Sequence, residues 1–400
     1  MLAGFGKEII NPPVGAELSG YGYYRERRNT GVMDNLYARC LYVEKDGLAA
    51  AAVSCDLLGL TGEVCSRVRD FASSIGIPPE RLMLCATHTH TGPAVAHLEG
   101  LGVVDPRYVA ELPDMIISAI KKAVADKAEV TDMQSSDTPI EPVGFNRALP
   151  GGPHDNRVRG VLIGRASRPI ALLSYACHPV TLGPRDKFSP DYPGEVCKVC
   201  EEQGMEAVFF TGICGDVDPV NNLIEWGSGT KETIREYGER IFAGFEKGLA
   251  PCPADFAAAY FPTELPVVPM TPEEAEACLD KAGHEQVAAF WMDHIRSIQP
   301  TPDSERIEVR AFRLGDLIIA SIPYEGFTVI GDLLREAWPK AFVAGCADAI
   351  LGYLPAREDW DCGCYAAIGS VFFYGRQIFQ KGAAEQLGAL LRDRLPGELA

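Results

Sequence analysis

The sequence lacks any apolar run that approaches the roughly twenty residues of a membrane-spanning helix. It also lacks a recognisable secretion signal, because the opening residues MLAGFGKEIINPP contain acidic and turn-forming residues where a signal peptide has its apolar core. From these two absences we expect a cytoplasmic protein without a membrane anchor.

Clusters of positive charge are missing as well. The 37 Lys and Arg residues are outnumbered by 55 Asp and Glu residues, which gives a net charge of −18. No basic tract and no ladder of alternating basic and aromatic residues occurs in the sequence. Nucleic acids and anionic membrane surfaces both require clustered Lys and Arg in a protein partner. The composition therefore argues against both kinds of partner.

The 13 cysteines form no disulfide framework, since their number is odd and their spacing is irregular. Many lie in apolar, strand-like runs, where a free cysteine behaves as a small core residue. Cys197 and Cys200 form one isolated CxxC pair, without the second pair that a zinc ribbon needs. Together with the missing secretion signal, this pattern indicates a reduced, cytoplasmic protein.

No repeat, low-complexity segment or Pro/Ser-rich linker divides the 400 residues. Apolar runs typical of strands alternate with helical patterns along the chain. This alternation favours an α/β fold of layered mixed β-sheets flanked by helices. The opening segment from Gly4 to Tyr24 is rich in Gly, Pro and Tyr, and we expect it to be a loop with little regular structure.

A helical insertion is predicted over about 270–300. The sequence TPEE at Thr271 combines a helix N-cap, a proline at the first helical position and acidic residues in the first turn. The segment has a surface-type composition, so we expect His284 and His294 within it to be solvated. With this insertion included, residues 1–400 are expected to form a single domain.

The most informative stretch is LMLCATHTHTGPA, from Leu82 to Ala94. Its apolar first half predicts a buried strand, which leads directly into His88 and His90. Alternate residues of an extended segment share a face, so both imidazole rings would point the same way. Imidazole is the commonest metal ligand and titrates near neutral pH. The pair is therefore a candidate metal or catalytic site, the alternative being that it only caps the strand by hydrogen bonding.

Three further predicted strands end in polar groups suited to the same site, namely His178, Glu325 and the loop that contains Asp216 and Asp218. Two histidines and a carboxylate with one open position are typical of a catalytic zinc. Such a metal lowers the pKa of bound water and polarises a carbonyl group. Each of these residues alone could be a solvated or turn-capping side chain. Their joint occurrence at strand ends is what predicts a zinc site.

Eight motifs resemble one protein family. ATHTHTGPA at Ala86 resembles the THTHSGPGG hallmark of the neutral/alkaline non-lysosomal ceramidase family. The other seven occur in the family's order and read GFGKEIINPP, SCDLLGL, FNRAL, ACHPVTL, CGDVDPVNN, IPYEGFTVIG and ILGYLPAREDWDCGCYA. Their order argues against a chance match, and the resemblance implies a catalytic domain of the neutral ceramidase type.

The resemblance also implies roles for individual residues. It implies four ligands for one Zn²⁺ ion: His88, His178, Glu325 and Tyr353. The tyrosine comes from the resemblance alone, because the strand-end pattern does not indicate it. His90 is implied to face the substrate, and Arg147 and Tyr365 are implied to line the site.

The sequence departs from the family pattern at several points. Asp218 replaces the serine of the family's Gly-Asp-Val-Ser-Pro motif, which lies close to the metal. A carboxylate cannot replace a hydroxyl unchanged, although it can hold or deprotonate a water molecule. The histidine motif ends in Ala94-Val95-Ala96, where the family motif ends in Gly-Gly. We also expect no C-terminal β-sandwich domain. These differences favour a small soluble substrate over a sphingolipid.

We therefore predict a zinc-dependent hydrolase that cleaves an amide bond, with zinc holding water and the scissile carbonyl oxygen. His90 or Asp218 is the candidate general base, and Tyr365 or Arg147 would stabilise the developing oxyanion. Ester, lactone or glycosidic bonds are alternatives, the last using Asp218 in an acid/base pair. A metal-binding protein without catalytic activity is the alternative from another class.

Outer parts of the site are also predicted. Asp56 and Asp216 are expected to orient the metal-binding histidines. Substrate specificity is expected to depend on three loops, Tyr21 to Arg28, Pro184 to Pro193 and Trp360 to Tyr365, together with the stretch after Gly92. Cys362 and Cys364 lie in the last loop and are predicted to line the pocket, the alternative being a second metal site. A homo-oligomer is compatible with the sequence.

Overall fold

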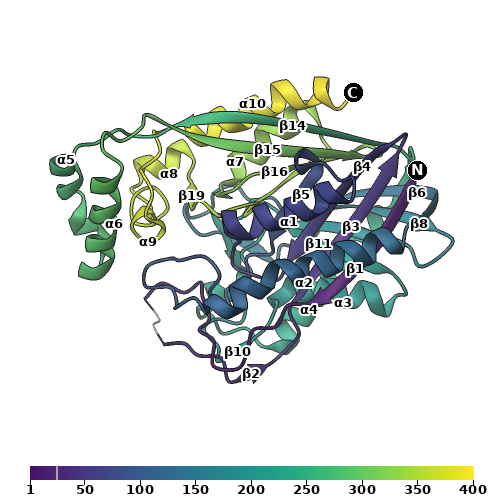
Figure 1. Ribbon diagram of the computed structural model, residues 1–400, viewed down its shortest axis with the longest axis horizontal. Helices are drawn as coiled ribbons and strands as arrows, with labels where there is room; N and C mark the ends of the chain where they lie inside the picture. Colours follow the sequence, from purple (N-terminus) through teal and green to yellow (C-terminus); the bar gives the residue numbers. More distant parts are fainter. Residues whose placement is uncertain (24–25) are drawn as a thin grey trace.

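The computed structural model describes residues 1–23 and 26–400. Its frame is a pair of β-sheets packed face to face, with helices on both outer sides (Figure 1). The nine strands of the larger sheet are β1 Leu2–Ile9, β3 Tyr37–Lys45, β4 Leu48–Cys55, β5 Leu82–Ala86, β6 Ala128–Pro139, β8 Arg157–Arg165, β9 Ile170–Tyr175, β11 Glu206–Thr211 and β13 Ala250–Cys252. Their order is β11-β9-β8-β6-β1-β3-β4-β5, with β13 beside β6.

The second sheet has the order β14-β15-β16-β18. Its strands are β14 Phe256–Pro266, β15 Ser304–Leu314, β16 Leu317–Ser321 and β18 Ala341–Ala344. Three two-stranded pairs complete the β structure: β2 Gly31–Val32 with β10 Lys187–Phe188, β7 Gly144–Asn146 with β12 Val217–Pro219, and β17 Glu325–Gly326 with β19 Tyr353–Leu354. Parallel and antiparallel neighbours occur in both large sheets, so the predicted mixed α/β architecture is confirmed.

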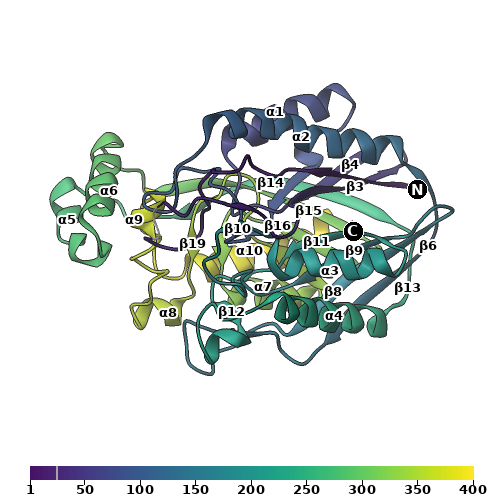
Figure 2. The same ribbon diagram turned by 90° about the horizontal axis from the view of Figure 1, so that it is seen from below.

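Helices cover the outer face of each sheet (Figure 2). On the larger sheet lie α1 Gly62–Ser74, α2 Pro106–Ala125, α3 Asp191–Glu202 and α4 Lys231–Gly248. On the smaller sheet lie α7 Thr328–Ala337 and α10 Ala383–Glu398. Two short helices, α8 Arg357–Asp361 and α9 Val371–Tyr374, precede α10. Within the described residues, no helix is both long and apolar enough to cross a bilayer.

Strand β3 shows why the larger sheet is apolar on both faces. Cys40 and Tyr42 pack towards α1 and α2, whereas Leu41 and Val43 pack towards the second sheet. Successive side chains of a strand alternate between faces, so a strand between two layers needs apolar residues at nearly every position. The continuous apolar runs of the sequence follow from this double burial.

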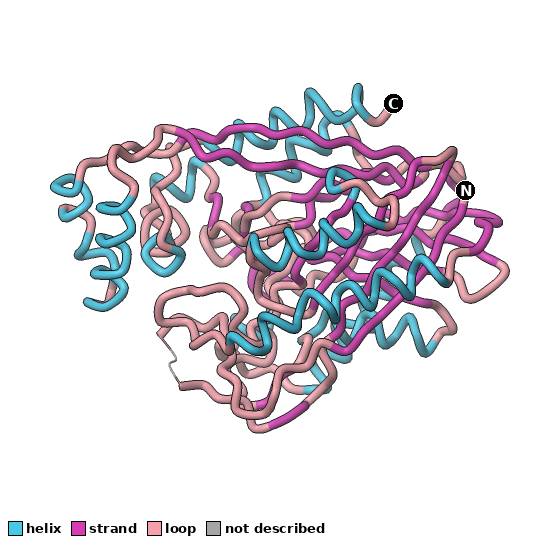
Figure 3. The backbone as a smooth tube through the Cα atoms, viewed as in Figure 1, coloured by secondary structure: helices cyan, strands magenta, loops and turns pink. Residues whose placement is uncertain are grey.

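The helical segment predicted over about 270–300 is present and projects from one end of the molecule (Figure 3). It consists of α5 Pro272–Glu276, a 3₁₀ turn and α6 Glu285–Ser297. Thr271 caps α5, because its side chain accepts a hydrogen bond from the Glu274 backbone N–H and the Glu274 side chain accepts one from the Thr271 N–H. The sequence signature at Thr271 therefore marks the start of α5 correctly.

The expectation of an opening loop is wrong for the first residues, because β1 runs near the middle of the larger sheet, paired with β3 and β6. Gly4 and Gly6 explain why the strand was not predicted and why it packs closely against α2. A Cβ atom on Gly4 would lie 2.0 Å from the Ala123 carbonyl oxygen, and one on Gly6 would lie 2.2 Å from the Ala119 carbonyl oxygen. Glycine is therefore required where α2 crosses β1, although it weakens the strand pattern in the sequence. Tyr24, the last residue of the expected loop, lies outside the described residues.

Substitution of Gly6 by alanine should destabilise the protein by about 1–3 kcal/mol, because the added methyl group overlaps the α2 backbone. The measurement is the free energy of unfolding in urea. Gly62→Ala is the control, since Gly62 begins α1 and no atom lies within 4 Å of a Cβ placed there. Equal stability of the Gly6 variant and the wild type would contradict the packing between β1 and α2.

Candidate metal centre

Strand ends and short strand pairs bring the predicted metal ligands together at one edge of the sheets. His88 follows β5, His178 follows β9, and Glu325 and Tyr353 are direct partners in the parallel pair β17–β19. A pocket of about 500 Å³ opens onto this edge, and His88, Glu325 and Tyr353 are among its lining residues. All four ligand candidates are buried.

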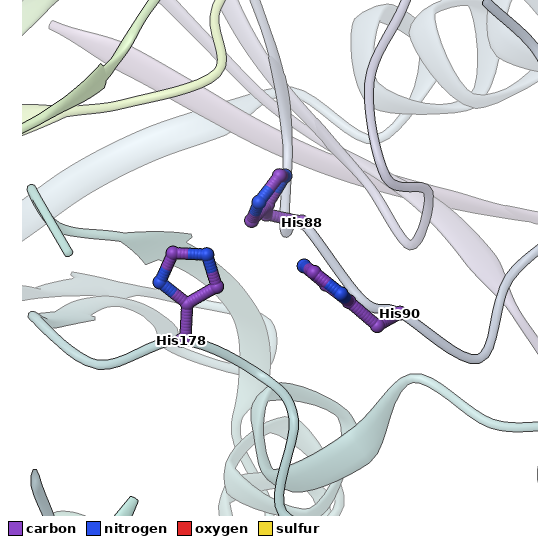
Figure 4. Close-up of side chains that lie close together, drawn as sticks. All are labelled: His88, His90 and His178. Atoms are coloured by element: carbon purple, nitrogen blue, oxygen red, sulfur yellow. The ribbon is translucent and has the colours of Figure 1, made fainter. Parts of the chain in front are cut away.

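The imidazole rings of His88, His90 and His178 lie close together and at steep angles to one another (Figure 4). The ring centroid of His88 lies 4.8 Å from that of His90 and 4.9 Å from that of His178. The predicted extended strand does not reach these residues, because β5 ends at Ala86 and His88 has a φ of 68°. A left-handed conformation is costly for a residue with a Cβ, and such strain is concentrated at functional sites.

Backbone carbonyls fix the tautomers of the two histidines. Nδ1 of His88 lies 2.7 Å from the Leu58 carbonyl oxygen, and Nδ1 of His178 lies 2.6 Å from the Cys214 carbonyl oxygen. A carbonyl oxygen only accepts hydrogen bonds, so each Nδ1 carries a proton and donates it. In the neutral rings, each Nε2 is therefore left with a lone pair. Burial, together with the nearby charge of Arg147, lowers the pKa of His178 and favours its neutral form.

Both Nε2 atoms converge on one carboxylate oxygen. Oε2 of Glu325 lies 3.0 Å from Nε2 of His88 and 3.0 Å from Nε2 of His178. The His88 atom has no hydrogen bond of acceptable geometry to any described residue. The His178 atom is within hydrogen-bond distance of the same oxygen, but with its proton on Nδ1 the neutral ring has none to donate there. Two Nε2 lone pairs and a carboxylate oxygen so close together are stabilised by a cation between them. Zinc bonds of about 2.0–2.2 Å would place neighbouring ligand atoms a little over 3 Å apart, so the three side chains fit a zinc ion.

His90 is the third histidine of the cluster. One ligand nitrogen from each of the three histidines lies within 4.8 Å of the others. Neither ring nitrogen of His90 has a hydrogen-bond partner among the described residues, although the side chain is buried. Burial and the neighbouring His88 and His178 hold the pKa of His90 well below its usual range. The ring is therefore a neutral base beside the candidate metal position.

Arg147 connects Tyr353 to the loop after β11. Its Nη2 donates to the Tyr353 hydroxyl at 2.9 Å, and its Nη1 donates to Oδ1 of Asp218 at 2.9 Å. The pocket lining includes Arg147 and Tyr353 but, among described residues, not Asp218. Tyr365 lies at the pocket mouth, with 53% of its surface exposed and its ring 5.9 Å from that of Tyr353.

The expected role of Asp56 and Asp216 is not borne out, because the histidine Nδ1 atoms bond to backbone carbonyls. Asp56 instead pairs with Arg39 at 2.8 Å, and Asp216 accepts the Thr328 N–H at the start of α7 at 3.1 Å. Asp56 therefore connects the end of β4 to β3, and Asp216 connects its loop to the start of α7.

The three predicted specificity loops contribute unequally to the pocket. Residues 21–23 and Tyr365 line it, whereas described residues of 184–193 do not, nor do Cys362 and Cys364. Residues 24–25 of the first loop lie outside the described residues.

Sequence reasoning missed several pocket residues. The hydroxyl of Tyr374 donates to Oε1 of Glu325, the second oxygen of the candidate ligand. His284, expected to be solvated, lines the pocket with its ring 3.5 Å from that of Tyr23. Trp226 stands half-exposed at the pocket, with its ring 5.2 Å from that of Tyr21. No motif or spacing in the sequence connects these segments, which only the tertiary fold brings together.

Comparison with known proteins gave matches in structure only. No family model matches the sequence, and a search of curated proteins gave no match. Among solved structures, neutral ceramidase from Pseudomonas aeruginosa matches with a TM-score of 0.76 and 18% sequence identity, over 98% of this chain and 74% of that chain. A ceramidase complexed with C2 matches with a TM-score of 0.78 and 18% identity, over 100% of this chain and 75% of that chain. The chain therefore has the fold of the neutral ceramidases.

Proposed function

We propose that this protein is a cytoplasmic zinc-dependent hydrolase that cleaves an amide bond in a small soluble substrate. The observation that carries the proposal is the convergence of the two Nε2 lone pairs of His88 and His178 on Oε2 of Glu325. Tyr353 is proposed as the fourth ligand because it is the β-pair partner of Glu325. A pocket of about 500 Å³ beside these groups is of the size that small ligands occupy.

A zinc ion held there would act as a Lewis acid on the scissile carbonyl and would activate a water molecule. His90 is the proposed general base, since it is a buried neutral imidazole with two unpartnered nitrogens. Arg147 and Tyr365 line the same pocket and would donate hydrogen bonds to the developing oxyanion. The side chains of Tyr374 and Arg147 hold Glu325 and Tyr353 in place.

The composition of the pocket favours amide hydrolysis over the glycosidase alternative. Glycosidases generally use two carboxyl groups on either side of the scissile bond. Glu325 is the one acidic side chain among the described residues that line the pocket, and it belongs to the proposed metal centre. A neutral base and cationic or phenolic donors are instead suited to acyl transfer.

The proposal is tested by metal removal and a substrate screen. Purified protein is treated with a chelator, reloaded with zinc, and assayed against 4-nitroacetanilide, 4-nitrophenyl acetate, chromogenic lactones and chromogenic glycosides. We expect hydrolysis of the anilide that disappears with the chelator and returns with zinc. Turnover restricted to glycosides would contradict the amidase assignment. Tight zinc binding without turnover of any acyl or glycosyl compound would favour a metal-binding protein without catalysis.

A further inference from the structure

Arg147 has one hydrogen-bond donor left for a substrate. A guanidinium group has five N–H bonds. Nε and Nη2 donate to the Gly215 carbonyl oxygen at 3.2 and 3.0 Å, Nη2 donates to the Tyr353 hydroxyl at 2.9 Å, and Nη1 donates to Asp218 at 2.9 Å. These four bonds leave one Nη1–H without a partner among the described residues. The side chain lines the pocket, which makes this N–H a candidate donor to a bound molecule.

Both carboxylate oxygens of Asp218 are engaged. Oδ1 accepts the bond from Nη1 of Arg147, and Oδ2 accepts a bond of 3.2 Å from the side-chain amide of Asn222. Only 8% of the Asp218 side chain is exposed, and the residue is absent from the described pocket lining. Asp218 is therefore largely covered by its hydrogen-bond partners and is not part of the described pocket lining.

The backbone places the two residues side by side. Strands β7 and β12 are antiparallel, and Phe145 is the direct partner of Asp218. Arg147 follows β7 immediately, and its backbone N–H donates to the Asp216 carbonyl oxygen at 2.8 Å. Two short strands thus hold the base of the Arg147 side chain, while Asp218, Gly215 and Tyr353 hold its charged end. A guanidinium fixed at so many points can present its free N–H without reorganising.

We propose that Asp218 is a positioning residue that orients the Arg147 guanidinium towards an anionic oxygen of the substrate, and that it is not the base of the reaction. This inference rests on the proposed hydrolase function, because it assigns Arg147 to the oxyanion. Without Asp218, Nη1 loses the anchor on the side next to its free N–H. The bonds to Gly215 and Tyr353 remain, but Nη1 is no longer held in position, and its hydrogen bond to the substrate weakens.

A double-mutant cycle tests the proposal through binding. The probe is phenylphosphonate, whose tetrahedral anion resembles an acyl-transfer transition state, titrated calorimetrically into the zinc-loaded protein. We expect Asp218→Ala and Arg147→Ala each to weaken binding about tenfold or more. The double variant should bind within about twofold of Arg147→Ala, since Asp218 acts through Arg147. The proposal would be overturned if the affinity loss of the double variant equalled the product of the two single losses. It would also be overturned if Asp218→Ala bound phenylphosphonate as tightly as the wild type.

Conservative and control variants separate positioning from other roles. Asp218→Asn retains an oxygen that accepts from Arg147, so phenylphosphonate binding and 4-nitrophenyl acetate hydrolysis should stay within about threefold of wild type. A hydrolysis rate as low as that of Asp218→Ala would instead identify Asp218 as the base and overturn the proposal. Asp126→Ala is the matched control, because it removes another Arg–Asp pair, with Arg165, away from the pocket. It should lower stability without changing binding.

The wild type also separates this inference from the proposed function. Failure of zinc-loaded wild type to bind phenylphosphonate would contradict the proposed metal centre and this inference with it. Binding by the wild type without coupling between the two residues would contradict this inference alone.

Discussion

Substitution of His88 by alanine should remove both the bound zinc and all hydrolytic activity. The side chain contributes one of the Nε2 lone pairs that converge on Oε2 of Glu325. Its loss leaves the site one ligand short, and a metal ion supplies several kcal/mol of transition-state stabilisation. Elemental analysis of the purified variant measures the metal content, and the 4-nitroacetanilide assay measures the activity.

The control for this experiment is His97→Ala. His97 is an exposed histidine whose side chain is 66% accessible, and it does not line the pocket. That variant should keep its zinc and its activity. An unchanged zinc content in the His88 variant would contradict the ligand assignment, whatever its activity.

Substitution of His90 by alanine should also lower the activity but should leave the bound zinc in place. We expect kcat to fall about 10²- to 10⁴-fold, the range that general-base catalysis contributes, while the zinc content stays unchanged. The reason is that both nitrogens of the His90 ring are unpartnered beside the proposed metal position, whereas Glu325 lies between the other two histidines. Elemental analysis and initial-rate kinetics on the same preparation measure both quantities.

The His90 experiment also discriminates between two ligand sets. His90 lies close enough to His88 and His178 for all three histidines to hold one ion. Loss of zinc from the His90 variant would show that His90 is a ligand, and the base would have to be sought elsewhere. Retention of zinc with a normal kcat would contradict its role as base.

Sequence periodicity predicted most of the fold because most strands are buried on both faces. The apolar runs before His88 and His178 become β5 and β9. Strand β1 escaped prediction because Gly4 and Gly6 dilute its apolar pattern. Those glycines are determined by the approach of α2, an element more than a hundred residues away in the chain. A contact of that range leaves no periodic trace in the sequence of the strand itself.

The site was likewise predictable only where it depends on local sequence patterns. A strand-end pattern brought His88, His178 and Glu325 together correctly, because strand ends on one side of a sheet meet at one edge. The expectation that an extended strand directs the His88 ring is wrong, since the backbone of His88 is left-handed. The hydrogen bond from Tyr374 to Glu325 had no local signal at all.

By itself, the sequence determined the layered α/β architecture and three of the four candidate metal ligands, His88, His178 and Glu325, because both depend on local patterns: apolar runs that form buried strands, and polar residues that follow them directly. Only the tertiary structure decided what each polar group does. Asp218 is next to Arg147 because two short strands pair there, and His88 is directed at Glu325 by a strained backbone and a carbonyl oxygen. Such roles depend on distances between segments far apart in the chain, which the order of residues alone does not fix.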